Sequence, residues 1–126
     1  MDLRKLDKRL EAERLSSEKE QSLWQHDFQN ATAIAGKLVA IVDANKKALL
    51  TRNVESIIDG KMPYLRLSFR RGFEYLEVQL VYFNDAFHLI AEKNSNRLYA
   101  FEKQLSPELT YSDLEDYLEQ LITENV

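Results

Sequence analysis

The chain has 126 residues, 44% of them apolar, which suffices for one domain with a hydrophobic core that needs no cross-links. It contains no Cys, so disulfides, thiolate zinc sites and thiol nucleophiles are excluded, and its charged start does not resemble a signal peptide. No apolar run approaches membrane-spanning length. The charged residues over 104–126 are all acidic and account for the negative net charge of the chain, which at −4 is too small to identify a partner.

The first predicted element is a helix over residues 2–15 with a thin apolar stripe. Leu3, Leu6 and Leu10 recur at helical spacing, and most of the residues between them are charged. Such a helix is marginal by itself because it buries little apolar surface. Ser17 and Glu20 then match a capping box, which either restarts the helix or lies within a continuous one.

A stronger helical pattern begins near residue 23 and continues to residue 58. Gly60 and Pro63 then end it. A hairpin over 37–51 is the alternative, which we disfavour because the turn has no Gly and the segment is rich in Ala and Lys. The apolar residues at helical spacing are Trp24, Phe28, Ala31, Ile34, Ala35, Leu38, Ile41, Val42, Leu49, Leu50, Val54, Ile57 and Ile58.

The length of this helical pattern predicts a departure from a compact shape. One unbroken helix over 17–59 would be on the order of 60 Å long. A single domain of this size cannot cover it, so we expect the helix either to bend near 43–45 or 51–53, or to project from the domain. We assign residues 1–22 to a projecting helical arm and 23–126 to a compact core.

Residues 63–102 predict four strands in an antiparallel meander, with turns at Arg71-Gly72, Asn84-Asp85 and 94–96. Because side chains alternate along a strand, even-length turns keep the apolar residues of neighbouring strands on one face. An even turn at Arg71-Gly72 pairs Leu67 with Leu76 and Leu65 with Val78. The predicted covered face then consists of Leu65, Leu67, Leu76, Val78, Leu80, Tyr82, Phe87, Leu89 and Ala91.

The other face of this sheet is polar with some apolar members. It is predicted to contain Tyr64, Arg66, Ser68, Tyr75, Glu77, Gln79, Val81, His88, Ile90 and Glu92. For the fourth strand, an even turn pairs Arg97 with Glu92 and puts Tyr99 and Phe101 on this open face. A three-residue loop over 94–96 buries both aromatic rings instead, and we favour that loop.

The last predicted element is an amphipathic helix over 112–123. Ser112 is expected to cap it, with Glu115 closing a capping box. Its apolar face consists of Leu114, Tyr117, Leu118, Leu121 and Ile122. Together these elements predict an α+β fold in which N-terminal helices and the C-terminal helix pack on one face of a four-stranded antiparallel meander.

The residues offer little chemistry for catalysis. His26 and His88 are the only imidazoles, no metal-binding motif is present, and the three isolated glycines form no phosphate-binding loop. The weakest of our functional hypotheses is an enzyme that uses His88 with Glu77 or Glu92, because a solvated histidine is the more common situation. We assign no catalytic residue and expect no metal and no cofactor.

Basic and aromatic residues interleave near the first predicted hairpin. Tyr64, Arg66, Arg70, Arg71 and Tyr75 on an open sheet could stack bases and neutralise phosphates of single-stranded nucleic acid. We disfavour this function because the excess positive charge over 61–103 is only two and the following segment is acidic.

The preferred hypothesis is a small cytoplasmic, non-catalytic protein-interaction module. Its basis is an arm too long and too thinly apolar to be covered by its own domain. The expected partner is a second copy in a homodimer, or another protein. The predicted partner-binding residues are Leu3, Leu6, Leu10, Trp24 and Phe28.

Overall fold

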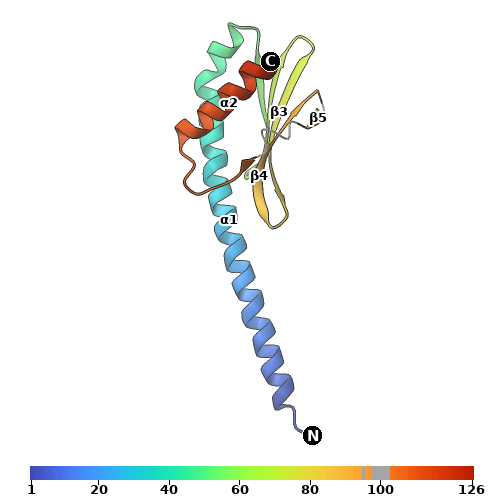
Figure 1. The fold of residues 1–126 in the computed structure, drawn as a ribbon. Coiled ribbons are helices and arrows are strands. Elements are labelled where there is room, and N and C mark those ends of the chain that lie inside the picture. Colours follow the sequence, from blue (N-terminus) through green and yellow to red (C-terminus); the bar gives the residue numbers. More distant parts are fainter. Residues whose placement is uncertain (95, 98–102) are drawn as a thin grey trace.

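A computed structural model of the chain describes residues 1–94, 96–97 and 103–126, with the backbone alone at 19–24 and 97 (Figure 1). The elements in chain order are α1 (Arg4–Leu50), β1 (Glu55–Lys61), β2 (Tyr64–Arg71), β3 (Glu74–Phe83), β4 (Ala86–Lys93), β5 (Asn96–Arg97), β6 (Lys103–Gln104) and α2 (Tyr111–Asn125).

Helix α1 is continuous over 47 residues, so Ser17 lies inside it and the alternative hairpin over 37–51 is wrong. At about 1.5 Å per residue its length is about 70 Å, and its N-terminal part projects beyond the rest of the fold (Figure 1). Ion pairs one turn apart, such as Arg14 with Glu18 at 3.6 Å, line the exposed part. They contribute a few tenths of a kcal/mol each.

The predicted continuation of this helix to residue 58 is wrong, because α1 ends at Leu50. Asn53 adopts a left-handed φ of 61°, and the backbone amide of Val54 donates to the carbonyl of Leu49 at 2.9 Å, which is a Schellman arrangement. The chain then enters β1, where the β-branched Ile57 and Ile58 pair with β2.

The sheet has the order β1-β2-β3-β4-β5, with β6 also paired to β4, so it contains more than the four predicted strands. In the β2–β3 hairpin Arg71 faces Glu74, so the two-residue loop is 72–73 and not Arg71-Gly72. The pairs are therefore Phe69 with Leu76 and Leu67 with Val78, which shifts our predicted register by two residues. An even shift leaves every side chain on its predicted face.

The β3–β4 hairpin has the predicted register, with Leu80 opposite Leu89 and Tyr82 opposite Phe87. Asn84 and Asp85 both have positive φ, at 49° and 59°, which a tight hairpin turn requires.

In the following hairpin Glu92 faces Arg97, so the turn is even and the favoured three-residue loop is wrong. Asn94 supplies the left-handed turn residue, at φ 49°, and its side chain accepts a hydrogen bond from the Tyr75 amide at 2.9 Å, which anchors the turn to β3. Tyr99 and Phe101 lie outside the described residues.

Helix α2 starts one residue earlier than predicted. Thr110 and Asp113 form the capping box, and the predicted pair of Ser112 and Glu115 does not. Both pairs match the same sequence pattern, but only Thr110 has the extended backbone that a cap needs. The residues predicted for the buried face that are confirmed as buried are Leu114, Tyr117, Leu118 and Leu121.

The hydrophobic core lies between one face of the sheet and the two helices, which cover the same side of it (Figure 1). The α+β class is confirmed. From α1 the core takes Ala31, Ile34, Ala35, Leu38, Ile41 and Val42. The predicted covered face is buried except at Tyr82, which is 37% exposed, and Phe69 is a buried member that our prediction omitted.

Candidate functional site

The N-terminal arm, residues 1–22 of the chain, has its apolar stripe exposed to solvent. Leu3, Leu6 and Leu10 are 51%, 39% and 50% exposed. At about 100° per residue they occupy an arc of roughly 60° on the helix. At the same angle per residue, the core residues further along α1, from Ala31 to Val42, fall on an arc whose centre is rotated by about 70° from this stripe, and the two arcs overlap only at one edge. The arm therefore presents an apolar stripe of its own beyond the domain.

The other two predicted partner-binding residues are Phe28 and Trp24, and the structure describes the side chain of only the first. Phe28 is partly buried and packs against the core of its own domain. Trp24 falls among the residues whose side chains are not described. The structure thus separates the exposed leucines of the arm from Phe28.

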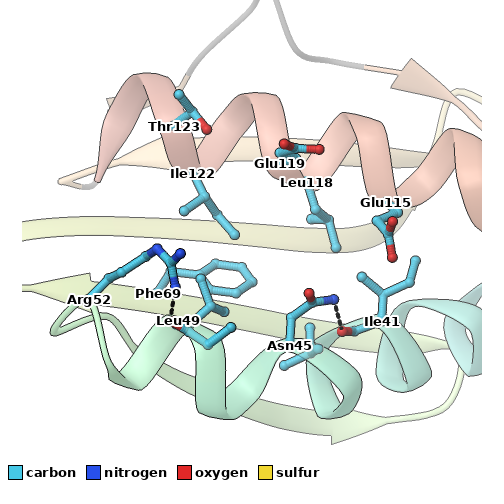
Figure 2. Close-up of a pocket in the computed structure, with 12 residues that line it drawn as sticks. Ile41, Asn45, Leu49, Arg52, Phe69, Glu115, Leu118, Glu119, Ile122 and Thr123 are labelled. Carbon is cyan, nitrogen blue, oxygen red and sulfur yellow. Dashed lines mark hydrogen bonds between the residues drawn. The ribbon is translucent and has the colours of Figure 1, made fainter.

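A groove of about 390 Å³ lies between the C-terminal half of α1 and α2 (Figure 2). Phe69 of β2 forms its floor, and Leu49 and Ile122 line its two walls. On the α1 side, Asn45 Nδ2 donates to the carbonyl of Ile41 and Arg52 Nη1 to that of Ala48, each at 2.8 Å, whereas Phe69, Leu49 and Ile122 contribute apolar side chains. The base of the groove is therefore largely apolar.

The rim of this groove on α2 is acidic. Glu115 and Glu119 lie one turn apart beside Leu118 (Figure 2). Neither forms an ion pair among the residues that the structure describes. From the sequence, Glu115 was assigned only to a capping box, and Glu119 was given no role. The signal was an acidic pair flanking the buried stripe of the last helix, but its place beside α1 follows only from the tertiary fold.

The outer face of the sheet contains a connected polar network centred on Glu77. Its side chain is 12% exposed and accepts from Arg66 Nε at 2.9 Å, from Tyr75 Oη at 2.8 Å and from the Gln79 amide. The Ser68 hydroxyl lies 3.2 Å from Tyr75 Oη. Such a network satisfies its own polar groups, which identifies it as a structural element of the sheet.

This face is less open than predicted, because Ser68 and Ile90 are both buried. They lie on the predicted side of the sheet, but burial removes them as contact residues. The Ser68 hydroxyl is in contact with Tyr75 Oη, at 3.2 Å.

The residues proposed for nucleic-acid binding do not form one free basic surface. Arg66 is paired with Glu77, and Arg70 lies over the ring of Tyr75 at 5.3 Å. Arg71 donates to the backbone carbonyl of Val126 at 2.6 Å, while the ring of Tyr64 packs near Phe87. A phosphate would have to displace these contacts, so the geometry gives this hypothesis little support.

His88 does not combine with either glutamate. It faces Val81 across the hairpin and stacks on Phe83, with ring centroids 4.0 Å apart. Glu92 is four residues along the same strand, about 14 Å away at roughly 3.4 Å per residue, and Glu77 lies opposite Glu92. In the described part of the chain, no three metal-binding side chains come together.

Comparison of the chain with models of protein families, with curated proteins and with solved structures finds no match. Within the described residues, no helix combines the length and the apolar character that a membrane crossing needs.

Proposed function

We propose that this protein is a non-catalytic, cytoplasmic interaction module that self-associates through its N-terminal arm. The observation that supports this most directly is the exposure of Leu3, Leu6 and Leu10 on one side of a helix that leaves its own domain. Three half-exposed leucines forfeit on the order of 2 to 4 kcal/mol for each arm. An assembly of two copies recovers this free energy at both arms.

The arm offers a control that its own geometry defines. Leu15 is 54% exposed, as much as the three leucines of the stripe, but lies about 180° from Leu6 on the helix. A substitution at Leu15 therefore removes exposed apolar surface from the arm without touching the stripe.

The test is the molar mass of the full chain by light scattering at tens of micromolar. The wild type is expected at a multiple of 14.8 kDa. The triple variant Leu3→Ser, Leu6→Ser and Leu10→Ser should be a monomer, and Leu15→Ser should keep the wild-type mass. A monomeric wild type would refute the proposal, and a triple variant that still associates would place the interface elsewhere.

A further inference from the structure

We propose that the groove between α1 and α2 receives the N-terminal arm of a second copy of the chain. This inference rests on the proposed function and specifies the surface that the arm contacts. A copy cannot fill its own groove, because α1 is one continuous helix and places Leu10 about 46 Å from Ile41. The arm that occupies the groove must therefore belong to another molecule.

The dimensions of the arm and the groove agree. The α2 wall from Glu115 to Thr123 is about 12 Å long, and the stripe from Leu3 to Leu10 is about 10 Å long. The volume of about 390 Å³ is lined mainly by apolar side chains, with Phe69 at its base (Figure 2). An apolar helix face fits such a groove in the manner of helix-in-groove recognition.

The charges beside these two surfaces are complementary. Lys5 and Arg9 lie one turn apart on one flank of the leucine stripe, at about 60° to 100° from Leu6. Glu115 and Glu119 have the same one-turn spacing on the rim of the groove. Among the described residues Arg9 forms one ion pair, with Glu13 of its own helix at 3.8 Å, and 69% of its side chain is exposed, so it is available for a new partner.

Direct pairing of two arms is opposed by the same charges. In a parallel pair built on the stripe, Asp2 would face Asp7 of the second copy and Arg9 would face Arg14. In an antiparallel pair that packs Leu6 on Leu10, Arg9 would face Arg9 and Asp7 would face Asp7 across the two-fold axis. Like charges face each other in both orientations, whereas the groove offers carboxylates to Lys5 and Arg9.

A charge exchange in the full chain tests this contact. Lys5→Glu with Arg9→Glu, or Glu115→Lys with Glu119→Lys, should weaken self-association by about tenfold or more. Combining all four changes in one chain restores opposite charges and should restore the association. The matched controls are Arg4→Glu with Lys8→Glu on the opposite face of the arm, and Asp116→Lys with Glu124→Lys, two exposed carboxylates of α2 that do not line the groove. Both controls should keep the wild-type affinity.

Cross-linking gives a second measurement, and the absence of Cys from the chain leaves no background. A mixture of Arg9→Cys and Glu119→Cys chains should yield a product of twice the mass with a short bis-maleimide, whereas Arg9→Cys alone should not. Cross-linking of Arg9→Cys with itself, or a normal affinity of the Glu115→Lys and Glu119→Lys variant, would overturn the groove contact. The proposed function would survive those two results if the triple leucine variant is monomeric.

Discussion

At the scale of single residues, the start of α2 shows how a side chain selects a helix boundary. Thr110 accepts from the Asp113 amide at 3.1 Å, and the Asp113 carboxylate accepts from the Thr110 amide at 3.0 Å. The hydrogen bond from the Thr110 backbone lowers the pKa of Asp113 below its ordinary value. Two otherwise unpaired amides of the first turn are thereby satisfied.

Thr110→Ala should lower the free energy of unfolding by about 1 kcal/mol, because it removes one side of this capping box. Ser112→Ala is the matched control and should change stability by less than about 0.5 kcal/mol. Urea unfolding of the two variants measures the difference. A larger loss for Ser112→Ala would show that the cap lies two residues further along.

The same box predicts a pH dependence. A carboxyl group with a lowered pKa in the folded state contributes stability that is complete above its unfolded pKa of about 3.9 and is lost as pH falls through its folded value. The stability difference between wild type and Asp113→Asn should therefore be constant near neutral pH and shrink below about pH 4. A difference independent of pH down to pH 2 would contradict this assignment.

At the scale of elements, α2 docks by a narrow apolar face, although its charged residues are all acidic. Leu114 and Leu121 are completely buried against α1 and the sheet, and burial also raises the pKa of Tyr117. The end of α1 depends instead on Asn53, which terminates the helix. Gly60 allows the β1–β2 turn that follows. A Cβ at Gly60 would collide with the carbonyl oxygen of Tyr64.

Leu121→Ala should cost about 2 to 5 kcal/mol of unfolding free energy, because it leaves a cavity where α2 meets the core. Leu15→Ala provides the exposed comparison and should cost less than about 0.5 kcal/mol. Chemical denaturation followed by circular dichroism separates the two. A loss below about 0.5 kcal/mol for Leu121→Ala would mean that α2 is not docked on its own domain.

At the scale of the whole molecule, the chain combines a compact α+β body with an arm whose described side chains take no part in its core. The described side chains of residues 1–18 are all exposed, and among the residues of α1 whose side chains are described, Phe28 is the first that packs against the core. Stability of the body and association through the arm are therefore separable properties. If the arm associates, the full chain gains stability by mass action as its concentration rises.

A chain that begins at Ser17 should accordingly unfold at a temperature that does not depend on protein concentration. The full chain should show a melting temperature that rises with concentration, since assembly stabilises the folded state. Differential scanning calorimetry over a hundredfold range of concentration makes the comparison. Equal concentration dependence in both chains would argue against association through the arm.

The sequence by itself determined the features that depend on neighbouring residues. Periodicity identified the buried face of α2 and the apolar stripe of the arm, and Asn84-Asp85 set the register of the β3–β4 hairpin because both residues tolerate positive φ. Alternation assigned the faces of the sheet even where the pairing was shifted by two residues, because an even shift preserves them.

Only the tertiary structure decided the features that depend on distant residues. Ile57 and Ile58 fit a helical pattern, and pairing of β1 with β2 makes them a strand. The tertiary structure also decided which predicted partner-binding residues are exposed. Apart from Trp24, whose side chain is not described, the core partly buries Phe28 and leaves Leu10 exposed. The groove and its acidic rim form because α2 lies beside α1, although the two helices are more than sixty residues apart along the chain. No local sequence pattern specifies such a contact.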